Sequence, residues 1–326
     1  MNYFIFDNPN DKYVMKFIIN NPNYTAVFPK NKLSSIFDYI SYSKYVLRLT
    51  SKQDVLIFWY DFLGVIFNLV KKVFLKKRKI IILNILLKNK STLKNKIVRS
   101  LYRKTLNDKR ILSTVCSLEY GKYLNHFLKI KKDYSVLYDP CHFKSTNETI
   151  FKENYVFCGG RNGRDWAFMY KVAKEMNKQN FCFVMNKKDF DIFNIKLENV
   201  KVYYDVPKER FNELLQNSMF VAMPLNTEAP AGLLAFYDAC YYGKAIITTK
   251  TVTTEEIFKN DRGILCENSI VEWKDRIDYL SKNSIYCQGI ASNFKEFLLN
   301  ECSEENYLKN VDGLIKRSEE LWQKRN

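Results

Sequence analysis

The segment of residues 223–257 has residue types and spacing that suit the binding of a diphosphate. An apolar run ends at Pro224, and a loop with the small residues Ala231 and Gly232 leads into a helical pattern from Leu233. Small side chains let an anion approach the backbone, and the free N–H groups of a helix's first turn attract negative charge. We therefore expect the amides of Ala231, Gly232 and Leu233 to bind phosphate oxygens.

An acid on the same predicted helix extends this site toward a nucleotide. Asp238 follows Gly232 by nearly two helical turns. A carboxylate there can accept two hydrogen bonds from ribose hydroxyls, as acids do in many nucleotide-binding sheets. Asp238 is therefore predicted to hold the ribose of a nucleoside diphosphate.

The run DACYYGKAIITT, residues 238–249, resembles the retaining GT-B glycosyltransferases. Their pattern is Glu-x7-Glu over a strand, a small-residue loop and a helix, followed by Gly-Lys before the next strand. Here Asp238 replaces the second Glu, while the position of the first Glu is Pro230 and the nearest acid is Glu228. The resemblance implies a catalytic role for Glu228. The replaced first Glu also leaves open a pseudoenzyme that binds sugar nucleotides without turnover.

The resemblance continues upstream in VFCGGRNGRDW, residues 156–166. This run matches the family's strand, glycine-rich turn and basic pair, which implies that Gly160, Arg161 and Arg164 surround the donor diphosphate. Arginine offers planar, bidentate donors that can stabilise a departing diphosphate. Both arginines are expected at loop positions rather than in a core.

The resemblance also implies that Asp205 and Val206 lie beside the nucleobase, and that arginines and amides replace a metal ion. An Asp-x-Asp triplet at residues 189–191 is separated from the preceding apolar strand by residues 186–188. We therefore interpret the triplet as a solvated loop rather than a metal site. The prediction is that the protein needs no metal and no other cofactor.

Apolar and amphipathic runs alternate along the chain, as expected for parallel sheets covered by helices. Strand-like runs occupy residues 3–6, 25–28, 55–60, 79–87, 110–116, 155–160, 181–186, 200–205, 219–224 and 244–249. Two such series predict an α/β fold of the GT-B kind, with two Rossmann-like domains facing an interdomain cleft.

The domain boundaries follow from a polar stretch near the middle of the chain. We expect an N-terminal acceptor-side domain at residues 1–140, a linker at 141–152 and a nucleotide-sugar domain at 153–305. A C-terminal helix at 306–326 is expected to pack back on the first domain.

Several features favour a cytoplasmic protein. The first residues lack the basic and apolar regions of a signal peptide, and the eight cysteines show no paired or metal-binding spacing, so we expect reduced, buried thiols. The apolar run at 55–70 is too short for a membrane span; we expect a strand to Tyr60 and a helix capped by Asp61. His126 is interpreted as a core or surface histidine.

The net charge of +17 is concentrated at residues 71–110, which hold fifteen Lys and Arg and the single acid Asp108. Lys94, Arg99 and Arg103 are predicted to form a cationic helix face that holds the protein on the inner, anionic surface of a membrane. The alternative is a nucleic-acid-binding protein that uses this stretch. No zinc module, RNP sequence or helix-turn-helix signature supports that alternative, and we expect no nucleic-acid partner.

The resemblance and the charge together predict a glycosyltransferase. We expect it to move a sugar with retention from a nucleoside diphosphate sugar, UDP-linked, to a saccharide or lipid-linked saccharide acceptor. The process predicted is the assembly of cell-surface polysaccharide or glycan.

Overall fold

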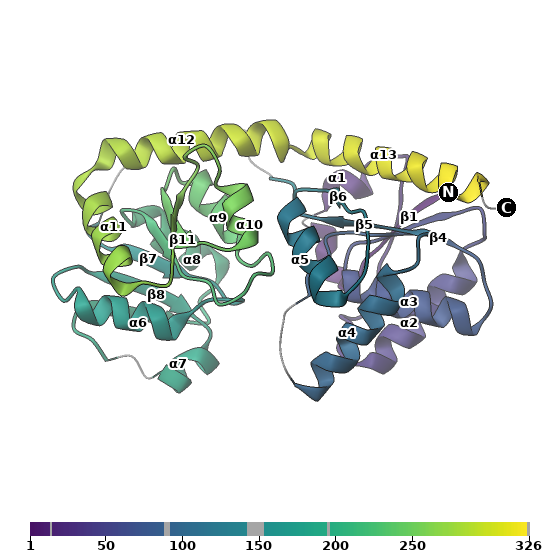
Figure 1. Cartoon of the computed structure of the whole chain (residues 1–326), viewed down its shortest axis with the longest axis horizontal. Helices are drawn as coiled ribbons and strands as arrows, with labels where there is room; N and C mark the ends of the chain where they lie inside the picture. Colours follow the sequence, from purple (N-terminus) through teal and green to yellow (C-terminus); the bar gives the residue numbers. More distant parts are fainter. Residues whose placement is uncertain (14, 88–91, 142–152, 194–195, 325–326) are drawn as a thin grey trace. The chain divides into compact units, whose positions relative to one another are not determined.

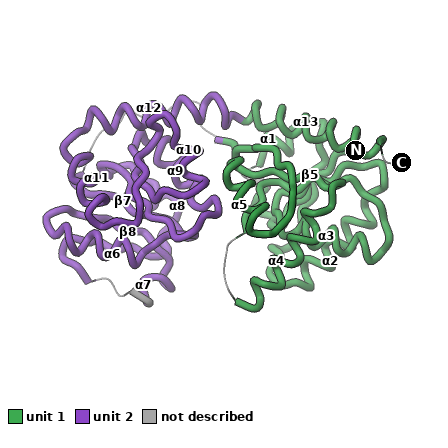
Figure 2. Tube along the Cα trace, viewed as in Figure 1, with its two compact units in different colours: residues 1–140, 304–326 green, residues 141–303 purple. Residues whose placement is uncertain are grey.

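The computed structural model describes residues 1–13, 15–87, 92–141, 153–193 and 196–324 (Figure 1). The chain divides into two compact units, shown in different colours in Figure 2. Unit 1 comprises Met1–Pro140 and Glu304–Asn326, and unit 2 comprises Cys141–Ser303. Of the linker expected at 141–152, residues 142–152 lie outside the described part of the chain.

Unit 1 contains a six-stranded parallel sheet in the order β2-β1-β3-β4-β5-β6. Its strands are β1 Asn2–Ile5, β2 Thr25–Val27, β3 Val55–Phe58, β4 Lys79–Ile82, β5 Ile111–Val115 and β6 Ser135–Val136. The five strands predicted in this half are confirmed, and their near-continuous apolar runs fit a sheet buried on both faces. Only β6 was missed, because two residues carry no usable pattern.

The helices of unit 1 cover this sheet (Figure 1). They are the 3₁₀ helix η1 Pro9–Tyr13 and α1 Lys16–Ile19, α2 Ile36–Leu49, α3 Asp61–Val73, α4 Leu93–Leu106, α5 Leu118–Leu128 and α13 Glu304–Gln323. Tyr307 and Val311 of α13 are buried in the same core as Ile81 of β4. The last helix therefore contributes its apolar face to the first sheet, although it follows unit 2 in the sequence.

Asp61 starts α3 but does not cap it as expected. Tyr60 is the N-cap residue, and Asp61 is 4% exposed. Its Oδ2 accepts a hydrogen bond of 2.8 Å from the Leu86 amide, and its Oδ1 accepts one from the Phe62 amide. The carboxylate thus ties the start of α3 to the segment after β4, and burial raises the pKa of Asp61 to about 6.

Unit 2 contains a second parallel sheet, in the order β12-β11-β10-β7-β8-β9. Its strands are β7 Val156–Gly159, β8 Phe181–Met185, β9 Val200–Tyr204, β10 Val221–Met223, β11 Ile246–Thr249 and β12 Ile264–Cys266. Its helices are α6 Trp166–Glu175, α7 Lys187–Phe193, α8 Lys208–Asn217, α9 Leu233–Tyr241, α10 Val252–Ile257, α11 Ile270–Lys282 and α12 Ser284–Glu301. The strand order reverses between the neighbours β7 and β10, and ligands bind beyond the carboxyl ends of strands at such a point.

The solvated loop expected at residues 189–191 is wrong, because these residues lie in helix α7. The Asn186 side chain donates to Asp189 Oδ2 at 3.1 Å, and an acid in a first turn is favoured by the helix dipole. All eight cysteines are buried thiols that form no disulfide with one another, as predicted. Within the described ranges, no helix combines the length and apolar character required to cross a bilayer.

Candidate functional site

Two loops of unit 2 meet where β7 and β10 end. The turn of residues 160–165 follows β7, and the loop of residues 224–232 follows β10 and leads into α9. The backbone of one joins the other, since the Asp165 amide donates to Pro224 O at 2.9 Å and the Asn226 amide donates to Gly163 O at 3.0 Å. The switch point of this sheet therefore carries a single, hydrogen-bonded surface made from both loops.

Arg164 lies at the centre of this surface and is only 5% exposed. Its Nε donates to Gly159 O at 2.8 Å and its Nη1 donates to Asn162 O at 3.1 Å. Burial lowers the pKa of Arg164 to about 10, so the side chain stays charged at neutral pH. The expectation that both arginines lie outside a core is wrong for Arg164, because its own turn folds over the guanidinium.

Two glycines make room for this guanidinium. A Cβ on Gly160, whose φ is +126°, would lie 2.4 Å from Nη2 of Arg164, and one on Gly232, whose φ is +88°, would lie 2.7 Å from Nη1. A side chain at either position would strain the backbone, because both φ values are positive, and would displace the Arg164 guanidinium. The structure thus brings together three residues that the sequence analysis assigned to the diphosphate. Gly160 and Arg164 come from the turn after β7, and Gly232 comes from the loop before α9.

The amino end of α9 opens beside the same guanidinium. Gly232 is the N-cap residue of α9, and Leu233 begins the helix. The first N–H groups of a helix have no partner within it, and together they carry partial positive charge. Ala231 and Leu233, which flank Gly232, are 6% and 5% exposed. A cation and a helix N-terminus therefore converge on one spot suited to phosphate oxygens.

Arg161 and Asp205 are both exposed, and Val206 is half-buried. Arg161 lies in the same turn as Arg164. The side chain of Arg161 can therefore reach solvent beside Gly160 and Gly232. Asp205 follows the edge strand β9 with φ of +48°, and its Oδ2 accepts a hydrogen bond of 3.2 Å from the Lys187 amide. The Asp205 carboxylate is thus used at the start of α7.

Glu228 anchors the loop before α9 to helix α10. Its Oε2 accepts a hydrogen bond of 2.9 Å from the Val252 amide, and its backbone oxygen accepts one of 3.0 Å from Thr253 Oγ1. A carboxylate at the first turn of a helix is a stabilising position. The geometry assigns Glu228 a positioning contact in this state of the protein.

Asp238 lies on α9 and forms an ion pair through its Oδ2 with Lys208 of α8. The side chain of Asp238 is 30% exposed and that of Lys208 is 58% exposed. This pair was not foreseen, because sequence spacing within α9 says nothing about which residue of α8 lies opposite.

The cationic face predicted on α4 is only partly present. Lys94 and Arg103 are exposed, but Arg99 lies over the Phe127 ring at 4.1 Å and donates to Phe127 O at 2.6 Å. Arg99 therefore belongs to the contact between α4 and α5, and its assignment to the outer face is wrong. Leu93 and Ile97 of the same helix are 75% and 57% exposed. His126, at the end of α5, is on the surface.

Comparison with known proteins supports the resemblance. The family model of the glycosyl transferases group 1 matches residues 187–297. No curated protein sequence matches the chain.

The fold is shared with solved glycosyltransferase structures. Sucrose-phosphate synthase from Thermosynechococcus elongatus superposes with a TM-score of 0.76 at 10% identity, over 97% of this chain and 98% of that one. HepE of Anabaena, solved with UDP-glucose, gives a TM-score of 0.72 at 12% identity, over 97% and 100%. TarM of S. aureus gives a TM-score of 0.65 at 15% identity, over 85% of this chain. The chain spans 58% of the length of TarM. The chain has the GT-B fold, and its resemblance to the group 1 glycosyl transferases is confirmed over residues 187–297.

Proposed function

We propose that the protein is a glycosyltransferase that moves a sugar from a UDP-linked donor to a saccharide or lipid-linked saccharide, with retention. The observation that carries the proposal is the Arg164 guanidinium, held between the backbones of Gly160 and Gly232 at the amino end of α9. The group 1 family match includes α9, and solved structures of the same fold contain UDP-glucose or UDP.

The proposed reaction begins with departure of the diphosphate from the sugar. Arg164 and the exposed Arg161 stabilise the negative charge that grows on the leaving group, and the amides at the start of α9 bind its oxygens. The acceptor hydroxyl attacks from the same face of the sugar, its new bond replaces the bond to the diphosphate, and its proton passes to the departing diphosphate. Charge stabilisation that appears only as the bond breaks raises the rate rather than merely tightening binding. In this proposal arginine and backbone amides supply the positive charge, and no metal is required.

Asp238 is proposed to hold the donor ribose. Lys208 occupies its Oδ2, so Oδ1 is the oxygen proposed to accept the hydroxyl bonds. Glu228 is proposed to act through position, by keeping the loop before α9 in place through the Val252 amide.

We also propose a cytoplasmic protein on the inner face of a membrane, active in polysaccharide or glycan assembly. The support for the membrane part is on α4, which carries exposed Lys94 and Arg103 and also exposed Leu93 and Ile97. A helix with exposed cationic and apolar residues suits an anionic lipid surface.

Binding and transfer can be tested separately. UDP-sugars are expected to raise the melting temperature of the full chain, because a ligand that binds only the folded state stabilises it. Arg161→Ala should lower kcat/KM strongly, whereas Arg276→Ala, which changes another exposed arginine, on α11, should leave it unchanged. The anomeric configuration of the product, read by NMR, tests retention.

Two results would redirect the proposal. Stabilisation by UDP-sugars without transfer to any saccharide acceptor would identify a pseudoenzyme. Tight, salt-sensitive binding of oligonucleotides with no response to sugar nucleotides would favour the nucleic-acid alternative.

A further inference from the structure

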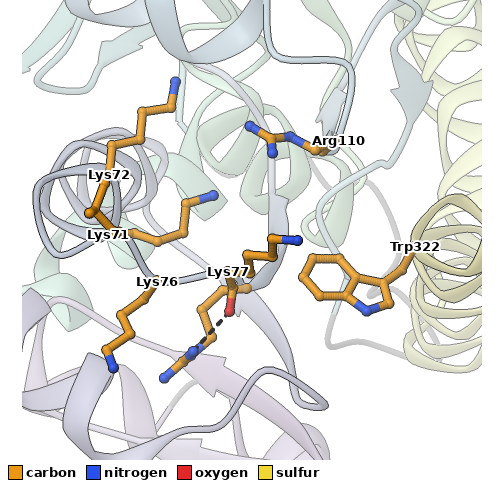
Figure 3. A pocket seen from close by; sticks show the side chains of 8 residues that line it. Lys71, Lys72, Lys76, Lys77, Arg110 and Trp322 are labelled. Carbon is orange, nitrogen blue, oxygen red and sulfur yellow. Dashed lines mark hydrogen bonds between the residues drawn. The ribbon is translucent and has the colours of Figure 1, made fainter. Parts of the chain in front are cut away.

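A cation-lined cavity of about 210 Å³ lies in unit 1 (Figure 3). Its lining residues are Lys71, Lys72, Leu75, Lys76, Lys77, Arg78, Arg110 and Trp322. They lie in the last turn of α3 and directly after it, before β4 and β5, and at the end of α13, so the cavity lies at the amino ends of the strands. Ligand sites of parallel sheets lie at the opposite, carboxyl ends. The cavity is therefore separate from the usual ligand position in such a sheet.

Lys71 contributes a nearly buried charge to this cavity. The side chain is 5% exposed, and it makes no hydrogen bond or ion pair with any residue that the structure describes. Burial lowers its pKa to about 8, although nearby Asp108 acts in the opposite direction. Figure 3 shows Lys71, Lys77 and Arg110 extending toward the same space beside Trp322. A buried cation of this kind is stabilised by an anion in the cavity.

The neighbouring acid does not neutralise the whole cluster. Asp108 is engaged by Arg110 at 2.8 Å and by Lys72 at 3.7 Å. Arg78 donates to the carbonyls of Leu47 and Thr50, which fixes its guanidinium toward α2. The six cations around the cavity therefore retain a large excess of positive charge.

An apolar turn stands in solvent at the rim of the same cavity. Val73, Phe74 and Leu75 are 78%, 48% and 89% exposed. Leu75 has φ of +52°, and the amides of Leu75 and Lys76 donate to Lys72 O and Lys71 O at 3.1 and 3.0 Å. This arrangement ends α3 in a Schellman motif, in which glycine is the usual residue with positive φ. Leu75 is thus both exposed to solvent and held at a positive φ that is unfavourable for leucine. Backbone outliers of this kind are concentrated at functional sites.

We propose that this surface docks the protein on an anionic phospholipid bilayer, with a lipid phosphate in the cavity and Val73–Leu75 in the boundary of the acyl chains. Two features indicate a phospholipid as the partner. The positive charge of the cavity is complementary to a phosphate, and the apolar turn beside the cavity suits acyl chains. A nucleic-acid backbone would match the cations but leave Val73 and Leu75 in water. Trp322, which lines the cavity, is of the residue type enriched at membrane interfaces.

The inference rests on the membrane association in the proposed function, and it locates that association at the end of α3 rather than on α4. The two surfaces can be separated by mutation. Lys76→Glu with Lys77→Glu alters the cavity, Lys94→Glu with Arg103→Glu alters α4, and Lys171→Glu with Lys178→Glu on unit 2 is the matched control for net charge.

The assay is sedimentation of the full chain with phosphatidylcholine vesicles that contain or lack phosphatidylglycerol. We expect binding only to the anionic vesicles, and weaker binding as salt rises. Each basic residue near a bilayer changes the partition about fivefold, so the cavity pair should reduce binding far more than the control pair. If Lys94→Glu with Arg103→Glu abolishes binding and Lys76→Glu with Lys77→Glu leaves it unchanged, the proposed location at the end of α3 is wrong.

Leu75→Gly distinguishes docking from a structural role. Glycine adopts the backbone of Leu75 without strain, so the melting temperature should stay the same or rise. Vesicle partition should fall about tenfold or more, because a leucine no longer enters the acyl boundary. Unchanged partition in this variant would contradict the insertion of the turn.

Two further measurements decide what fills the cavity. Glycerol 3-phosphate should compete weakly, and stabilisation by that soluble phosphate without any vesicle binding would overturn the bilayer as the partner. RNA that binds with the same mutational pattern, without vesicle binding, would overturn it as well. UDP-sugar stabilisation is measured without vesicles, so its failure would reject the proposed sugar transfer and leave the docking result standing.

Discussion

Replacing Arg164 by lysine separates the charge at the candidate diphosphate site from its geometry. The guanidinium donates to Gly159 O and Asn162 O while it lies against both glycines. Lysine keeps one charge but has a single nitrogen, which cannot serve two carbonyls and a phosphate together. Alanine is less informative, because each buried carbonyl left without its donor costs about 1–3 kcal/mol of stability.

The burial of the site predicts an unusual pH dependence for Arg164→Lys. Burial lowers the pKa of Arg164 to about 10, and it lowers that of Lys71, a lysine with the same 5% exposure, to about 8. A lysine at position 164 should therefore lose its proton in the range of Lys71. Above that range the charged fraction falls about tenfold with each pH unit, and kcat/KM for sugar transfer should fall with it.

The assay measures kcat/KM at a series of pH values below and above the pKa of Lys71. The melting temperature of the variant is recorded at each pH. Wild type should show no such fall, because Arg164 stays protonated there. Arg161→Lys is the matched control, since its exposed position leaves a lysine with an ordinary pKa. A profile of Arg164→Lys that runs parallel to wild type would refute the reasoning, because the charge at this position would then not act on the leaving group.

Other perturbations test the remaining parts of the site. Arg161→Ala should lower kcat/KM about 100- to 1,000-fold with an unchanged melting temperature, because Arg161 is exposed. Gly232→Ala should lower both the melting temperature and UDP affinity, since its Cβ would lie 2.7 Å from Nη1 of Arg164; calorimetry and UDP titration measure both. Asp238→Asn should weaken UDP binding about tenfold and leave free phosphate binding unchanged, and equal loss of both would contradict a ribose contact. Transfer should persist in EDTA, and its complete loss with recovery in Mn²⁺ would reject a metal-independent reaction.

Much of the local structure could be read from the sequence. Continuous apolar runs between amphipathic stretches predicted ten strands, all of which form, because strand and helix patterns depend on neighbours in the chain. The small residues at Ala231 and Gly232 predicted the start of α9, since a loop with little steric bulk precedes that helix. The triplet at residues 189–191 was misjudged as a loop because residues 186–188 separate it from the preceding strand, whereas a helix begins within that separating segment and an acid suits its first turn.

What the sequence by itself determined is therefore the order of elements, the α/β class and the residue types gathered at the loops after β7 and β10. Only the tertiary structure decided which of those residues meet. The burial of Arg164 between Gly160 and Gly232, and the use of Arg99 on Phe127, follow from loops and helices that are distant in sequence. Periodicity specifies one face of one element, but the partner of that face is set by sheet order and packing, which no local pattern contains.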